Sequence, residues 1–256
     1  MEDKIAVFID LENLVLGDKQ PIIGFNIQKI LERLLEKGKI VAKRAYCDWE
    51  KYPKEKLALH GAAIDLIEIP HRGMTGKNSA DIRLVVDALD MCFSKEHISI
   101  FVIVSGDSDF SPLVSKLKEN GKTVIGVGRK QASSELLISN CDEFIFYEDL
   151  FRPVGEPPKI KGLPRKKAQV MYWLIDALQA LMRENKEVLL ASTIKQTIKR
   201  KRPFFDEGEF GYDSFSELLE DAQANGIIKL DRHSKSGTYV VTGYGSKEDK
   251  PGKARI

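Results

Sequence analysis

The sequence lacks the cysteine and histidine patterns that mark disulfide-bonded and zinc-binding proteins. Its three cysteines, Cys47, Cys92 and Cys141, are odd in number and widely spaced, with no CxxC pair. None of the four histidines belongs to an HxxxH pair. These absences argue against a disulfide framework and a structural zinc site, and we expect three thiols that act as small apolar side chains.

Long apolar segments are also missing. No run approaches the roughly 20 residues that a membrane span needs, so we expect no membrane contact. The N-terminus, MEDKIAVFID, has neither the basic start nor the long apolar segment of a secretion signal. We therefore expect a cytoplasmic protein.

Residues 4–150 alternate between apolar runs typical of buried strands and amphipathic stretches typical of helices. This alternation predicts an α/β fold with a parallel sheet covered by helices on both faces, and a ligand site at the carboxyl ends of the strands, near the switch in strand order. Ser79 is expected to cap one helix. The predicted strands are 4–10, 40–49, 64–70, 98–105, 122–128 and 143–149, and the predicted helices are 25–38, 54–63, 79–93, 111–121 and 133–141.

Several motifs of other α/β enzymes are absent. There is no GxxxxGK[ST] nucleotide loop and no GxSxG elbow. GVGRKQ at 126–131 lacks the third glycine of a dinucleotide fingerprint and does not follow the first strand. A haloacid-dehalogenase-type phosphatase would need an aspartate where Glu12 stands.

The remainder of the chain predicts a second, smaller unit. Residues 151–166 are rich in proline and basic residues, which indicates an extended linker or a basic strap over a polyanion. Residues 167–243 predict three helices followed by two short strands, the pattern of a winged helix-turn-helix domain. Residues 244–256 are expected to be disordered. The helices are expected at 167–186, 189–203 and 213–226, and both strands within 227–242.

The charge is divided unevenly. Residues 1–150 contain 20 Lys/Arg and 24 Asp/Glu, whereas residues 151–256 contain 20 and 14. An acidic half joined to a basic half fits a catalytic domain joined to a polyanion-binding domain, although such a division can also be accidental.

Three segments bring acidic residues to predicted strand ends. FIDLENL provides Asp10, KNSAD provides Asp81, and SGDSDF provides Asp107 and Asp109. Each residue alone can simply begin the following helix. Together they would repel one another unless a cation is present, and carboxylates are ligands for Mg²⁺ or Mn²⁺. Such a site suits phosphodiester hydrolysis, with Asn13 able to orient water or phosphate.

FIDLENL, KNSADIRLVVDAL and VSGDSDFSPLVSKLKENGKTVIGVG resemble the NYN domain, a branch of the PIN-like nuclease superfamily, over about residues 3–150. The resemblance implies a PIN-like parallel sheet and a Mg²⁺- or Mn²⁺-dependent endoribonuclease. Asp87 shares a helix with Asp81 but lies six residues later, so we leave it outside the metal set. The resemblance implies metal binding by Asp10, Asp81, Asp107 and Asp109, with supporting roles for Asn13 and Ser105.

Residues 166–243, and above all GYDSFSELLEDA, resemble the LOTUS (OST-HTH) domain. The pairing of this domain with NYN resembles an architecture familiar in bacteria. It implies RNA binding or docking of a protein partner. Phe204, Phe205, Phe210 and Phe215 can stack on bases, but their spacing near helices favours the core.

Basic residues are the candidates for contact with RNA. Arg72 and Lys77 lie on the loop beside the acidic site, and Arg129 and Lys130 follow the fifth strand. All four can equally be solvated surface charges. A further run ends the second helix of the smaller unit, where cations also stabilise a helix end. It consists of Lys199, Arg200, Lys201 and Arg202.

The expected function is that of a metal-dependent endoribonuclease with a C-terminal RNA-binding domain. Two alternatives remain at this point: a non-catalytic RNA-binding protein that keeps the nuclease fold, and an adaptor whose small domain docks another protein. The RNA target, the number of metal ions and the oligomeric state are left open.

Overall fold

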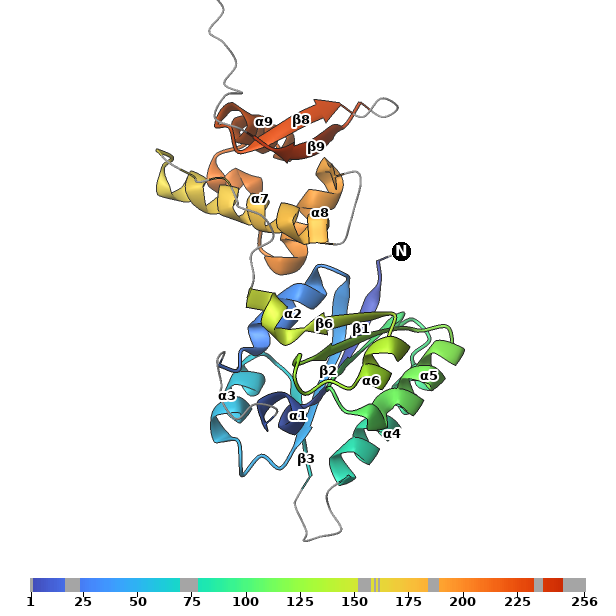
Figure 1. Cartoon of the computed structure of the whole chain (residues 1–256). Helices are drawn as coiled ribbons and strands as arrows, with labels where there is room; N and C mark the ends of the chain where they lie inside the picture. Colours follow the sequence, from blue (N-terminus) through green and yellow to red (C-terminus); the bar gives the residue numbers. More distant parts are fainter. Residues whose placement is uncertain are drawn as a thin grey trace, which may run out of the picture. The chain divides into compact units, whose positions relative to one another are not determined.

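In the computed structural model the chain forms two compact units, Met1–Arg152 and Pro153–Ile256. Figure 1 shows the elements of both units. The structure describes residues 2–16, 24–69, 78–151, 158, 160, 162–183, 189–232 and 237–245.

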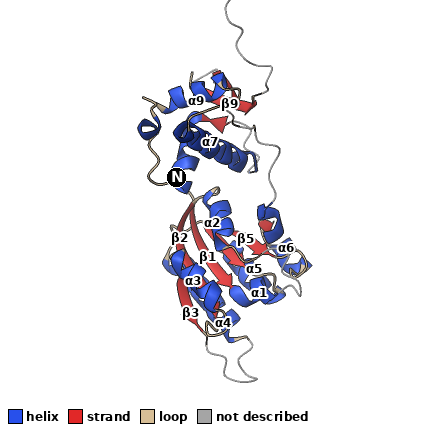
Figure 2. Cartoon of the chain, turned by 90° about the vertical axis from the view of Figure 1, so that its left-hand side faces the viewer, coloured by secondary structure: helices blue, strands red, loops and turns tan. Residues whose placement is uncertain are grey.

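The first unit is built on a six-stranded sheet with the order β3-β2-β1-β4-β5-β6, and every pair of neighbours is parallel (Figure 2). The predicted α/β class is therefore confirmed. The strand order reverses between β1 and β4, which places the switch point at their carboxyl ends. The strands are β1 (Lys4–Asp10), β2 (Lys39–Cys47), β3 (Asp65–Glu68), β4 (Ile100–Val104), β5 (Thr123–Gly128) and β6 (Glu143–Phe146).

Helices cover both faces of the sheet because the central strands are apolar on both sides. In β1, Ile5, Val7 and Ile9 pack into one buried cluster, whereas Ala6 and Phe8 pack into the other. The first cluster includes side chains of α1, α2 and α3, and the second includes side chains of α4, α5 and α6. Figure 1 shows these two sets of helices on opposite faces of the sheet. The helices are α1 (Leu11–Leu16), α2 (Ile27–Leu35), α3 (Pro53–Gly61), α4 (Ser79–Ser94), α5 (Ser111–Glu119) and α6 (Glu135–Asn140).

The predicted elements of this unit are present, with differences at their ends. The short helix α1, which directly follows β1, was not predicted from the sequence. Ser79 is the first residue of α4 rather than its cap; Asn78 holds the cap position, without a side-chain capping bond. The last strand is shorter than predicted, because a 3₁₀ turn begins at Tyr147.

The second unit contains the predicted three helices and two terminal strands, together with a short strand that was not predicted. That strand, β7 (Leu189–Leu190), pairs with β9 and makes an antiparallel sheet of order β7-β9-β8. One buried cluster joins all three helices to this sheet. The other elements are α7 (Arg165–Arg183), α8 (Ala191–Lys201), a 3₁₀ turn at Glu207–Phe210, α9 (Phe215–Ala224), β8 (Ile228–Arg232) and β9 (Tyr239–Tyr244).

The four phenylalanines of this unit differ in burial. Phe205 packs against Phe210, Phe215 and Trp173 in the core, as their spacing predicts. Phe204 is instead 94% exposed, so the prediction of core packing is wrong for this residue. Phe204 lies in the turn that follows α8, which the bond from the Phe205 N–H to the Arg202 carbonyl at 2.9 Å closes, so its ring is at the surface while Phe205 re-enters the core.

Two further features concern the described residues of the whole chain. The three cysteines are free thiols, with Cys47 and Cys92 buried and Cys141 half-buried. None of the described helices is both long and apolar enough to span a membrane.

Candidate active site

The candidate site lies at the carboxyl ends of β1 and β4, the two strands on either side of the switch point. Asp10 is the last residue of β1, and Ser105 directly follows the end of β4. The strands pair in parallel with Ile9 opposite Val104, so both chain segments leave the sheet at the same level. The site is therefore positioned by the most buried part of the sheet.

A hydrogen-bond network joins the two strand ends. Asp10 is only 7% exposed, and its carboxylate accepts the Ser105 hydroxyl at 3.0 Å and the Asn13 backbone N–H at 3.3 Å. The Asn13 side-chain oxygen accepts the Gly106 N–H at 2.7 Å. The Ser105 hydroxyl also accepts the Asp107 N–H at 3.2 Å. These bonds fix Asp10 and the SGDSDF segment relative to one another.

Gly106 allows this segment to pack closely against the chain that follows β5. A Cβ atom at this position would lie 2.4 Å from the carbonyl oxygen of Ala132, far inside contact distance. The Gly106 carbonyl oxygen accepts the Ser134 N–H at 2.9 Å. A side chain larger than hydrogen would therefore displace the loop before α6.

Asp107 and Asp109 begin a turn and are also candidate metal ligands. Asp107 precedes the 3₁₀ turn Ser108–Phe110, and its Oδ1 accepts the Asp109 N–H at 3.0 Å. Asp107 is half-buried and Asp109 is exposed. The two residues can therefore begin the turn and also serve as metal ligands. Capping uses one oxygen of Asp107 and leaves the carboxylate of Asp109 at the surface.

Asp81 brings a third segment to the site from the first turn of α4. Burial, followed by the charges of Asp107, Asp109 and Glu12, raises the pKa of Asp81 to about 6. Burial, followed by Asp81 and to a smaller extent Glu12, raises the pKa of Asp10 to about 7. Carboxylates from all three predicted segments therefore act on one another electrostatically in the folded chain.

Glu12 is a member of this group that the sequence argument did not place among the ligands. It lies in the first turn of α1, two residues after Asp10, and it raises the pKa values of both Asp10 and Asp81. The Cys47 thiol lies 3.8 Å from Glu12 Oε1. Burial and then Glu12 raise the thiol pKa, so it stays protonated as a donor. In the sequence, only its position in FIDLENL, two residues after Asp10, indicated that Glu12 belongs to the acidic group.

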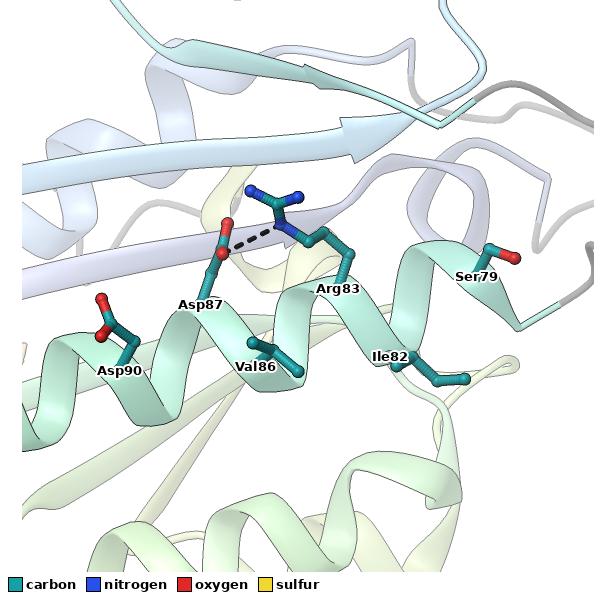
Figure 3. Close-up of a pocket in the computed structure, with 6 residues that line it drawn as sticks. All are labelled: Ser79, Ile82, Arg83, Val86, Asp87 and Asp90. Carbon is teal, nitrogen blue, oxygen red and sulfur yellow. Dashed lines mark hydrogen bonds and ion pairs between the residues drawn. The ribbon is translucent and has the colours of Figure 1, made fainter.

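Asp87 has a different environment, as Figure 3 shows. Its carboxylate accepts the Tyr46 hydroxyl at 2.9 Å and Arg83 Nε at 3.0 Å, and it lies 3.4 Å from a guanidinium nitrogen of Arg44. The contacts with Tyr46 and Arg44 tie α4 to β2, whereas the contact with Arg83 lies within α4. An open hollow of about 460 Å³ lies beside them on α4, lined in part by Val86 and Asp90.

The basic candidates of the first unit are placed differently from one another. Arg72 and Lys77 lie outside the described residues. Arg129 is buried; its Nε donates to the Leu14 carbonyl at 2.7 Å, and its guanidinium lies over the ring of Tyr147. Arg129 therefore holds the end of α1. Lys130 is exposed and pairs with Asp149 at 2.9 Å.

The basic run at the end of α8 is partly used within the unit. Lys201 pairs with Asp176 at 3.1 Å, and its side chain is almost fully buried. Arg200 donates to Thr197 at 3.2 Å, and Arg202 lies over the ring of Trp173. Lys199 is exposed and pairs with no other described residue. The four residues are Lys199, Arg200, Lys201 and Arg202.

Comparison with protein families decides the classification of the first unit. The family model of the NYN domain matches residues 4–148, which include every strand of the six-stranded sheet. The chain belongs to the NYN-domain family. The NYN domain has a PIN-like nuclease fold, and the parallel sheet with helices on both faces agrees with it.

Two other proteins resemble the NYN unit. An uncharacterized protein of Methanocaldococcus jannaschii is 31% identical over 147 residues, which make up 56% of this chain and 55% of that protein. The chain therefore matches about half the length of this relative. A crystal structure of a protein of unknown function from Vibrio parahaemolyticus is 23% identical, with a TM-score of 0.52, and covers 59% of this chain and 96% of that one. This likeness concerns the fold.

Proposed function

We propose that the NYN unit is a metal-dependent endoribonuclease that hydrolyses RNA phosphodiesters. The observation that supports this proposal is that acidic side chains from three chain segments near the switch point of the sheet raise one another's pKa. Clustered carboxylates repel an RNA strand unless a cation lies between them, so the cluster favours catalysis over simple binding. The proposed ligands are Asp10, Asp81, Asp107 and Asp109.

The donor set fits a hard divalent cation. Apart from the protonated Cys47 thiol it offers oxygen atoms, which Mg²⁺ and Mn²⁺ prefer. As the side chains stand, no three Asp, Glu, His or Cys residues in the described part of the chain are grouped closely enough to hold an ion. Asp81 is half-buried and Asp109 is exposed, so we expect these two to turn toward Asp10 when a cation binds.

The residues of the chain have distinct proposed tasks. Ser105 and the Asn13 N–H hold Asp10 in a fixed orientation. Asn13 Oδ1 is occupied by Gly106, whereas its Nδ2 donates to no other described residue and is available to orient water or a phosphate oxygen. When bound, Mg²⁺ or Mn²⁺ would polarise the phosphate and lower the pKa of a water.

We also propose that the second unit is a winged-helix domain of the LOTUS type that binds RNA. Its three helices and three-stranded antiparallel sheet support this assignment, as do the exposed Lys199 and Phe204 near the end of α8. An exposed aromatic ring beside cations can stack on a base while the cations contact phosphates. Binding by residues 152–256 should then weaken steeply as salt rises. Absence of binding even at low salt would favour a protein-docking adaptor.

The nuclease proposal is tested with the double variant Asp107→Asn, Asp109→Asn. We expect loss of Mn²⁺-dependent cleavage of RNA and an unchanged circular dichroism spectrum, since both residues lie at a surface turn. Asp90→Asn is the matched control, because Asp90 is an exposed carboxylate farther along α4 (Figure 3). Unchanged cleavage by the double variant would overturn the proposal. Binding of RNA by the wild-type chain without cleavage under any metal would favour the non-catalytic alternative.

A further inference from the structure

A second hollow of the NYN unit adjoins the candidate site. It is an open groove of about 630 Å³ between α5 and α6, and Asp109 lines it together with the turn that follows β4. Three serine residues line the groove from the turn and α5, namely Ser108, Ser111 and Ser115. The groove thus extends from a proposed catalytic carboxylate across a surface rich in hydroxyl groups.

Ser111 carries the strongest sign that the groove receives a ligand. The residue is only 5% exposed, and its Oγ is buried without a hydrogen-bond partner among the described residues. The Ser115 hydroxyl does not fill this role, because it donates to the Ser111 carbonyl at 3.2 Å. A buried hydroxyl without a partner is costly to the folded state, and a polar ligand atom would remove that cost.

The rest of the lining indicates the chemistry of the ligand. Leu136 is 56% exposed and Pro112 is also exposed, so the groove has an apolar part. The Asn140 side-chain amide bonds to no other described residue and offers both a donor and an acceptor. Asp109 is the one charged residue of the described lining. A neutral, flat group with hydroxyls suits this surface better than a phosphate does.

We propose that this groove seats one nucleoside unit of the RNA, the one adjoining the scissile phosphodiester. Its base would pack on Leu136 and Pro112, and its 2′-hydroxyl, which is both donor and acceptor, would bond to Ser111 or Asn140. The inference rests on the proposed nuclease function, because Asp109 belongs to both sites. The groove would then be the part of the NYN unit that distinguishes RNA from DNA.

The first test fills the groove. Ser115→Trp places a large side chain at an exposed lining position, and Ser94→Trp makes the same change at the exposed last residue of α4, which does not line the groove. With Mn²⁺ and a short single-stranded RNA, we expect Ser115→Trp to raise KM about tenfold with little change in kcat, and Ser94→Trp to change neither. An unchanged KM in Ser115→Trp would overturn the proposal.

A binding measurement separates failure of the groove from failure of the nuclease proposal. RNA carrying 4-thiouridine is photo-crosslinked to the full chain in EDTA, and the crosslinked peptides are identified. We expect crosslinks within 108–115 or 136–140 that Ser115→Trp suppresses and Ser94→Trp keeps. If the wild-type chain never cleaves RNA but these crosslinks appear, the groove proposal stands and the nuclease proposal fails. Crosslinks confined to the second unit would overturn the groove proposal.

The second test concerns the 2′-hydroxyl. Ser111→Ala should leave the thermal stability unchanged or raised, because it removes a buried hydroxyl that lacks a partner. We expect the same variant to raise KM for RNA about three- to tenfold. A single 2′-deoxy substitution next to the cleavage site should raise KM of the wild type by a similar factor and that of Ser111→Ala by much less. Equal losses in both proteins would overturn the role of Ser111.

Discussion

Two aspartates of the NYN unit, Asp10 and Asp87, are each 7% exposed and have opposite surroundings. Asp87 is bonded to Tyr46 and paired with two arginines. Asp10 accepts hydrogen bonds from a hydroxyl and a backbone N–H, and the charges that raise its pKa are those of the carboxylates Asp81 and Glu12. The chain therefore supplies cations to the aspartate that joins α4 to β2. Among the described residues, no cationic side chain pairs with Asp10, the aspartate at the switch point. A metal site requires a carboxylate that is not already paired in this way.

The largest difference between these aspartates is expected in catalysis. Asp10→Asn should reduce Mn²⁺-dependent RNA cleavage by about 100- to 1,000-fold, because it removes a proposed ligand at the reacting centre. Asp87→Asn should leave the rate per folded molecule within about threefold. Single-turnover cleavage of one RNA by both variants checks this. A similar loss in the two proteins would mean that Asp10 has no special part in the chemistry.

In stability the order is reversed: Asp87→Asn should destabilise the folded chain, whereas Asp10→Asn should stabilise it. Asp87→Asn should lower the free energy of unfolding by about 1–2 kcal/mol, since Arg44 and Arg83 lose a charged partner but remain partly solvated. Asp10→Asn should raise it by about 1–3 kcal/mol at pH 8 without metal, since a buried carboxylate with a raised pKa is removed. Urea denaturation in EDTA measures both. Destabilisation by Asp10→Asn would show that its charge is already neutralised by the chain.

The dependence of stability on pH gives a finer test. Asp10 has a folded pKa of about 7 and Asp81 of about 6, both above the usual value of about 4. Between pH about 4 and pH about 7 the folded chain therefore binds more protons than the unfolded chain, and stability falls as pH rises. Thermal midpoints in EDTA should decline more steeply in the wild type than in Asp10→Asn. Parallel curves for the two proteins would contradict the assignment.

Much of the fold was predictable because its signals are local. The apolar runs at 4–10 and 98–105 specify strands buried on both faces, and the acidic residues after them mark the site. The helix α1 was not predicted because its six residues are too few to show the recurrence of apolar residues that marks a helix. The strand β7 has only two residues and exists through its pairing with β9.

The partners of single side chains were not predictable, since they depend on contacts distant in sequence. Arg129 was a candidate for guiding RNA, with a solvated surface charge as the alternative, yet it is buried against the carbonyl of Leu14, 115 residues away. Its contact with RNA stays a prediction. Phe204 and Phe205 have the same chemistry and neighbouring positions, and only packing of the second unit separates the exposed ring from the buried one.

The proposed function depends on the binding of a divalent cation by the carboxylates around Asp10. The most direct test is calorimetric titration of Mn²⁺ into the wild type, Asp10→Asn and Asp87→Asn at pH 7. We predict that the wild type and Asp87→Asn bind Mn²⁺ alike and release protons, because Asp10 must be ionised to bind a cation. Asp10→Asn should bind at least about tenfold more weakly. Equal affinity in all three proteins would show that Asp10 is not a ligand of the cation.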